Sequence, residues 1–258
     1  MEFCSFNAPA PDLVVATAIH NGHELRPELA TLITLDGTTR AREEDPHTGL
    51  VASRFGISAV VHRSRFEVDL NREREDAFYR TPNEAWGLEV WNGSLTEEHV
   101  DESLRLYDSF YETLSSILDG VVAEVGGFVL YDIHSYNHRR SGPDSEPEPI
   151  ADNPTVNLGT GSLPSMWRAI ADTFVETMRA SSLDGVGLDV RENVRFRGGH
   201  LTRWVNGKFG DHGCALAIEL KKVFMDEWTG ALDAESLNQL ADALLASVGP
   251  VTEKFADL

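Results

Sequence analysis

Short runs of apolar and β-branched residues alternate along this chain with longer segments of helical periodicity. Three such runs are typical of buried strands: residues 13–19, 128–133 and 215–220. Three segments with apolar side chains at helical spacing predict helices: residues 96–118, 164–180 and 233–248. Because strands that alternate with helices assemble into one sheet, the pattern predicts an α/β fold with a mixed, mostly parallel central sheet flanked by helices.

The remaining segments add detail to this single predicted domain, which takes up residues 1–258. Residues 58–61 and 65–70 are predicted as two short strands, the second ending at Asn71. Residues 139–164 hold five prolines and several glycines, which predicts one long loop. A loop of that length inside a compact domain is usually functional, so we expect an active-site wall or lid there.

Polar side chains follow three of the predicted strands at the point where each strand ends. In open α/β sheets the ligand crevice lies beyond the carboxyl ends of the strands, so these side chains should converge there. They are His20, His23, Asn71, Arg72 and His134.

Two histidines three positions apart in a turn, His20 and His23, and the distant His134 suit a catalytic zinc ion. Such sites use three protein ligands and keep a fourth position for water, whose pKa the zinc lowers to about 7. The alternative is that each histidine only caps a strand or bonds a buried carbonyl.

Two carboxylates lie within or beside the predicted strands. Glu219 has apolar neighbours on both sides, so its carboxylate must be paired, directed at a metal or raised in pKa. The alternative for Glu219 is an outward-facing edge position. Asp132 precedes His134 by two residues and shares its face. It therefore either orients a metal-binding histidine as an outer partner or accepts backbone hydrogen bonds at the strand end.

Basic and polar residues elsewhere are candidates for binding an anion. Asn71 and Arg72 could hold a substrate carboxylate, because arginine binds carboxylates through a planar fork. The alternative for Arg72 is a surface ion pair with a neighbouring glutamate. His200 and Arg203, beside a glycine pair that permits close backbone approach, could reach the same anion.

The composition limits the partners of the protein. The 258 residues include 42 acidic and 22 basic side chains, a formal net charge of −20, which argues against wholesale binding to nucleic acid or anionic membranes. With Cys4 and Cys214 as the only cysteines, a disulfide framework and a cysteine-type zinc site are excluded. The first residues show neither the positive nor the apolar region typical of a secretory signal, and no run approaches the roughly 18 apolar residues of a membrane span, so we expect a cytoplasmic protein.

Three blocks of the sequence resemble the N-formylglutamate amidohydrolase family: residues 68–91, 131–140 and 198–227. The Asp-Leu-Asn-Arg and Asp-Ile-His-Ser motifs inside the first two are the most specific parts. The turn at His20 resembles the family's N-terminal His-x-Gly turn, and the likeness covers most of residues 13–228.

The resemblance implies a zinc hydrolase with a phosphorylase/hydrolase-like fold related to metallocarboxypeptidases and aspartoacylase. It implies one zinc ion per chain held by His20 and His134, and Glu219 as the general base. It also implies that Asn71 and Arg72 clamp the substrate carboxylate.

This chain departs from the relatives at one ligand position. Where they carry a metal-binding glutamate, this chain has His23, followed directly by Glu24. We predict His23 as the ligand, with Glu24 as the alternative and Glu44 or Asp45 as a more distant one.

The expected activity is hydrolysis of a small N-acyl acidic amino acid, with N-formyl-L-glutamate as the substrate typical of the family. Another N-acyl-amino-acid hydrolase, a carboxypeptidase-like peptidase and an inactive binding homologue are the alternatives. Such an anionic substrate would require a compact positive pocket on an otherwise acidic surface. The basic residues expected around it are Arg63, Arg65, Arg72, Arg74, Arg139, Arg140 and those of residues 191–208.

Overall fold

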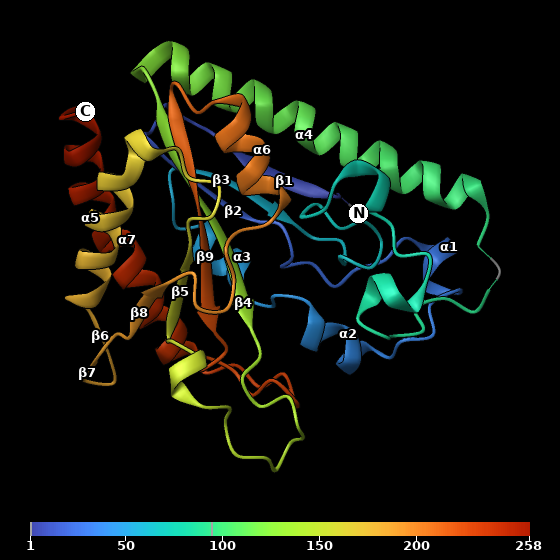
Figure 1. Ribbon diagram of the computed structural model, residues 1–258. Helices are drawn as coiled ribbons and strands as arrows, with labels where there is room; N and C mark the ends of the chain where they lie inside the picture. The colour runs from blue at the N-terminus through green and yellow to red at the C-terminus, as the bar shows by residue number, and fades with distance from the viewer. Residues whose placement is uncertain (1, 94) are drawn as a thin grey trace.

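A seven-stranded sheet forms the centre of the protein in a computed structural model, which describes residues 2–93 and 95–258 (Figure 1). Its strands lie in the order β1-β3-β2-β4-β9-β5-β8, and β6 and β7 form a separate hairpin. The strands are β1 Cys4–Asn7, β2 Val14–Ala18, β3 Ile57–Val61, β4 Phe128–Tyr136, β5 Val156–Gly159, β6 Ser182–Leu183, β7 Val186–Gly187, β8 Val190–Glu192 and β9 Gly213–Lys221.

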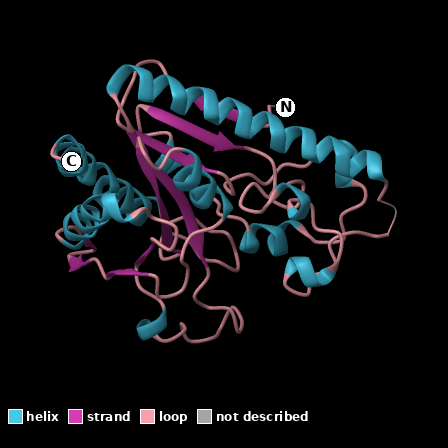
Figure 2. Cartoon of the chain, turned by 45° about the horizontal axis from the view of Figure 1, so that its top comes forward, coloured by secondary structure: helices cyan, strands magenta, loops and turns pink. Residues whose placement is uncertain are grey.

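Helices cover both faces of this sheet (Figures 1 and 2). Apolar residues of α4 and α6 pack on one face, and those of α3, α5 and α7 pack on the other. The helices are α1 Pro27–Ala30, α2 Gly37–Glu43, α3 Thr48–Ala52, α4 Glu97–Val125, α5 Arg168–Arg179, α6 His200–Lys208 and α7 Ala234–Ala256. The described residues also form the 3-10 turns η1 Arg74–Asp76, η2 Pro82–Ala85, η3 Ile150–Asp152 and η4 Ser165–Trp167.

The predicted mixed, mostly parallel sheet flanked by helices is confirmed. Strand β2 pairs in parallel with β3 and β4, and β4 pairs in parallel with β9. Strands β1 and β5 are antiparallel to their neighbours β3 and β9. The carboxyl ends of β2, β4 and β9 therefore meet at one edge of the sheet, where the crevice is expected.

The alternation of side chains along β4 decides which of them face the crevice. Tyr131 belongs to the core beneath α5 and α7, whereas Phe128 and Leu130 belong to the core beneath α4 and α6. Because alternate residues of a strand share a face, Asp132 and His134 lie on the same face as Phe128 and Leu130, the face covered by α4 and α6, but nearer the carboxyl end of the strand.

The prediction of a strand over residues 65–70 is wrong, because this segment is a turn and an irregular stretch. Its carboxylates Glu67 and Asp69 are fully buried, and each is compensated by arginine side chains and a backbone N–H. Alternating polar residues normally indicate a half-exposed strand, but here they bury charge in side-chain networks.

The predicted loop of residues 139–164 is interrupted by strand β5, which pairs antiparallel with β9. The run from Val156 to Leu158 buries both of its apolar side chains in the sheet, a signal that the surrounding prolines hide. In the described parts of the chain, no helix is long and apolar enough to cross a membrane.

Phe174 tests the packing of α5 on the sheet. Its ring is completely buried and meets the ring of Tyr131 edge-on at 5.3 Å between centroids. We expect Phe174→Ala to lower the free energy of unfolding by about 3–5 kcal/mol, because a cavity remains. Denaturant titration followed by circular dichroism measures the loss.

The control is Ile150→Ala, since Ile150 is 72% exposed. Its expected change is within about 0.5 kcal/mol. Equal losses for the two variants would contradict this account of the core.

Candidate metal and catalytic site

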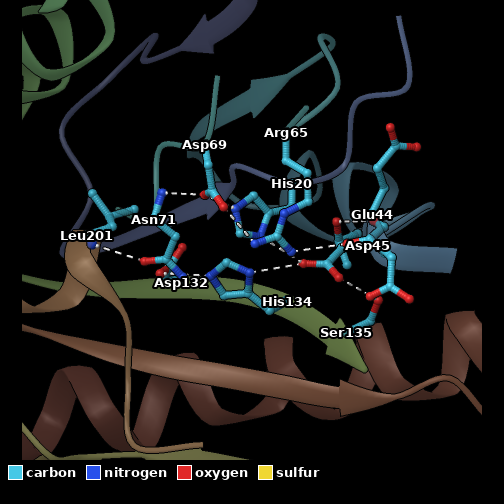
Figure 3. A network of polar contacts seen from close by, with 12 residues as sticks. His20, Glu44, Asp45, Arg65, Asp69, Asn71, Asp132, His134, Ser135 and Leu201 are labelled. Carbon is cyan, nitrogen blue, oxygen red and sulfur yellow. Dashed lines mark hydrogen bonds and ion pairs between the residues drawn. The ribbon is translucent and has the colours of Figure 1, made fainter. Parts of the chain in front are cut away.

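His20 lies two residues beyond the end of β2 and is buried at the edge of the sheet (Figure 3). Its Nε2 is 2.7 Å from Asp69 Oδ1, and its Nδ1 is 3.5 Å from Asp45 Oδ2. The backbone carbonyl of His20 also accepts a hydrogen bond of 2.8 Å from the N–H of Asp45. Two carboxylates therefore face the two nitrogens of one imidazole.

His134 comes from within β4, and its ring centroid lies 4.9 Å from that of His20. Its Nδ1 is 3.0 Å from Asp45 Oδ2. Its Nε2 has no hydrogen-bond partner among the described residues, although Asp132 Oδ2 lies 3.0 Å away. Burial alone would lower the pKa of His134, but the negative charge of Asp132 raises it well above its usual value.

Asp45 brings a carboxylate between the two histidines from the acidic turn after α2. Ser135 Oγ donates to Asp45 Oδ1 at 3.3 Å, and the buried ammonium of Lys222 donates to the carbonyls of Arg42 and Glu44 just before it. Burial by itself would raise the pKa of Asp45, but hydrogen bonds from His134 and His20 bring it below the usual range.

The three side chains have a composition that suits a metal ion. One ligand atom from each of His20, Asp45 and His134 falls within 4.8 Å of the others, and all three residues are buried. Two imidazoles and one carboxylate are the donor set of many catalytic zinc sites. Asp69 and Asp132 lie beside the Nε2 atoms of the two imidazoles, so the Nδ1 atom of each is the one directed at Asp45.

The structure does not bring His23 into this group. Residues on either side of it make β-bridges with the chain after β3, Gly22 with Ser64 and Glu24 with Arg63. This extended path directs the His23 imidazole outward, where it is 48% exposed and its Nδ1 lies 2.5 Å from Glu44 Oε2. The group that the described residues form also omits Glu24, so the acidic turn supplies the third side chain.

Glu219 lies beside His134 in the parallel register of β4 and β9. The two side chains share a face, because residues at the same register position point the same way. Burial raises the pKa of Glu219 to about 7, even though the nearby His134 acts to lower it. A carboxyl that titrates near neutral pH beside such a group is suited to move a proton.

A cavity of about 290 Å³ opens over these residues. It contains four of the predicted site residues: His20, Asn71, His134 and Glu219. The predicted site residues outside its wall are His23, Glu24, Arg72, Asp132, His200 and Arg203. The remaining wall residues are Arg42, Glu43, Asp45, Arg65, Trp86, Ser135, Tyr136, Asn137, Arg140 and Phe196.

Asn71 and Arg72 have different environments in the structure. The side-chain oxygen of Asn71 accepts the backbone N–H of Leu201 at 3.1 Å and so caps the start of α6. Arg72 turns away from the cavity: it donates to the carbonyl of Glu84 at 2.5 Å, and its guanidinium lies 4.4 Å from the ring centre of Tyr79.

His200 and Arg203 also face away from the cavity, at the start of α6. Both approach the same carboxylate, that of Glu73, with His200 Nδ1 at 3.0 Å and Arg203 Nη2 at 3.7 Å from its Oε1. The sequence predicts no helix over this segment, but a cap supplied by the distant Asn71 allows one from His200 onward.

Sequence reasoning assigned no role to Asp69, which is fully buried behind His20. Burial would raise its pKa, but Arg65 and His20 hold it well below the usual value. Arg65 lies 2.7 Å from Asp69 Oδ2 and also lines the cavity. The signal was present in the Asp-Leu-Asn-Arg motif, since an aspartate in an apolar run requires compensation.

The fold and the buried group define a single-domain α/β protein with a candidate metal site, and the comparisons make this specific. The N-formylglutamate amidohydrolase model matches residues 13–225. The chain therefore belongs to the N-formylglutamate amidohydrolase family, a family of amidohydrolases.

Solved structures agree with this assignment at the level of fold. A crystallised N-formylglutamate amidohydrolase from Ralstonia eutropha JMP134 is 16% identical, with a TM-score of 0.78 over 100% of each chain. A protein from Agrobacterium tumefaciens is 19% identical, with a TM-score of 0.67 over 100% of this chain and 96% of that one. A comparison with curated protein sequences returned no match.

Asp69→Asn tests the charge behind His20. The amide keeps the shape but leaves Arg65 without its anion, so we expect a loss of about 3–5 kcal/mol in the free energy of unfolding. Urea titration in the presence of a chelator measures the loss without any contribution from bound metal.

The matched control is Glu73→Gln, whose side chain is 58% exposed although it too pairs with an arginine, Arg203. Its expected cost is below about 1 kcal/mol. An Asp69→Asn variant as stable as this control would refute the role given to Asp69.

Proposed function

We propose that this protein hydrolyses a small N-acyl acidic amino acid, N-formyl-L-glutamate in particular, to formate and L-glutamate. The observation that carries the proposal is the placement of Glu219 and the group of His20, Asp45 and His134 on one small cavity, in a chain of this family. The cavity volume of about 290 Å³ suits a small molecule rather than a polymer.

We propose that His20, Asp45 and His134 hold one zinc ion. When bound, a zinc ion supplies Lewis acidity, which polarises a carbonyl oxygen and makes a water molecule more acidic. Two further carboxylates contact the proposed ligands: Asp69 faces one nitrogen of His20, and Asp132 lies beside His134. Outer partners of this kind set the orientation and basicity of ligating imidazoles.

Glu219 is the proposed general base. It accepts a proton from the attacking water as the water oxygen bonds to the formyl carbon, and it returns that proton to the nitrogen as the C–N bond breaks. A pKa of about 7 suits both transfers, because the carboxyl can hold the proton between them. Arg65, fixed by Asp69 and by the hydroxyl of Tyr79, is placed to steady the developing negative charge.

Glu219→Gln tests the base. The amide cannot accept the proton, so kcat for N-formyl-L-glutamate should fall by about 10²–10⁴-fold while the zinc content is retained. Formate release and elemental analysis measure the two quantities. Glu176→Gln, an exposed change on α5, should leave both unchanged. Full turnover by a zinc-loaded Glu219→Gln variant would refute the assignment of Glu219 as the general base.

Asp45→Asn and His23→Gln together test the third ligand. Removing the charge of Asp45 should raise the dissociation constant for zinc beyond the roughly 10–100-fold that an outer partner contributes. His23→Gln should change it only a few-fold, since this side chain points outward. Competition with a chromophoric chelator measures both constants. The reverse order of effects would restore His23 as the ligand.

A further inference from the structure

We propose that Arg42 and Arg140, positioned by Trp228, bind the two carboxylates of the substrate and so select N-acylated dicarboxylic amino acids. The inference rests on the proposed function for the bond that is cleaved, but the anion preference is argued from these three residues. Both arginines line the cavity above the group of His20, Asp45 and His134.

Arg42 carries a charge that the described residues do not compensate. Its guanidinium lies 3.6 Å from the centre of the Trp228 ring, and none of the described carboxylates forms an ion pair with it. Its Nε is buried without a hydrogen-bond partner in the same parts of the chain. Stacking on the ring fixes the direction of the guanidinium, so little conformational freedom remains to be lost when an anion binds.

Arg140 reaches the same cavity from the segment after β4, and that segment is anchored just before it. The buried carboxylate of Glu227 accepts the backbone N–H groups of His138 at 3.1 Å and Arg139 at 2.6 Å. The indole N–H of Trp228 donates to the carbonyl of Arg139 at 2.9 Å. The exposed side chain of Arg140 has neither an ion pair nor a hydrogen bond with the described residues.

Trp228 therefore helps to position both arginines. Its ring packs against the guanidinium of Arg42, and its N–H holds the backbone beside Arg140. The side chains come from two segments almost a hundred residues apart, α2 and the segment after β4. Two cations held by separate segments match a ligand with two carboxylates better than a ligand with a single carboxylate. This geometry points to a dicarboxylate.

The other basic residues expected around the pocket do not compete for this role. Most of them are already paired with carboxylates, including Arg65 in the cavity wall, and Arg72 is directed at the ring of Tyr79. The pairs are Arg63 with Glu67, Arg65 with Asp69, Arg74 with Asp108, Arg139 with Asp226, Arg191 with Asp189 and Arg195 with Glu148.

The cavity wall also contains carboxylates, and the balance still favours an anion. Asp45 faces His20 and His134, and Glu219 lies beside His134 in the register of β4 and β9. Glu43 alone is left to offset Arg42 and Arg140, and it lies partly exposed to water. Arg42 is half-buried and Arg140 is exposed, and neither pairs with a described carboxylate, so both guanidinium groups are available to bind a carboxylate through the planar fork.

Kinetics with three substrates test the inference: N-formyl-L-glutamate and its two monoamides, N-formyl-L-glutamine and N-formyl-L-isoglutamine. We expect Arg42→Gln and Arg140→Gln each to lower kcat/KM for the dicarboxylate by about 10–100-fold, mainly through KM. Each variant should leave the kcat/KM of one monoamide unchanged, the one that lacks the carboxylate bound by that arginine. An equal loss on all three substrates would overturn the proposal.

Three further variants sharpen the result. Arg139→Gln is the matched control, because Arg139 adjoins Arg140 but pairs with Asp226, and it should retain full kcat/KM on all three substrates. Arg140→Lys should recover part of the loss, since it restores the charge without the fork. Trp228→Leu should raise KM for the dicarboxylate with little change in kcat, and a fall confined to kcat would contradict its positioning role.

Binding of the amino-acid product separates this inference from the proposed function. Calorimetry on the purified protein should give a dissociation constant at least tenfold lower for L-glutamate than for L-glutamine. One of the two arginine variants should abolish that preference. If the preference holds but no formyl substrate is cleaved, the proposed function fails and the anion site stands. If wild-type protein shows no preference, the anion site is refuted, whatever the activity.

Discussion

The carboxylate of Asp69 is the interaction on which the site depends. It is fully buried, and every one of its hydrogen bonds fixes a different part of the site. Its donors are His20, Arg65, the backbone N–H of Asn71 and the hydroxyl of Tyr79. A buried anion is stable only when it is this completely compensated, so the segment that carries it cannot shift without a large cost.

The parallel sheet supplies the second constraint. Because β4 lies between β2 and β9, the residues at their carboxyl ends converge without any specific contact being needed. The register then decides the chemistry, since it puts Glu219 beside His134 on the face that carries Asp132. A shift by one residue would turn each of these side chains into the opposite core.

Charge is distributed unevenly in this acidic protein. With a formal charge of −20, long-range electrostatics disfavour an anionic substrate, and most arginines are used in internal ion pairs. The exceptions that matter are Arg42 and Arg140, which meet at the cavity beside Trp228. Local charge at short range, rather than the net charge, therefore governs what this cavity accepts.

The sequence by itself determined the α/β class, the identity of the main strands, and His20, His134 and Glu219 as residues of one site. The class, the strands and the two histidines follow from local periodicity and from the rule that parallel strands end at one edge, whereas the family resemblance is what assigned Glu219 to the site. Only the tertiary structure decided the third member of the group, because Asp45 comes from a turn whose position depends on Lys222 and on the path of the chain after His20. It also decided which arginines face the cavity, since spacing along the chain does not reveal which carboxylate each guanidinium will meet. Long-range pairing of charges is a property of the folded core, and for that reason no local pattern could have given it.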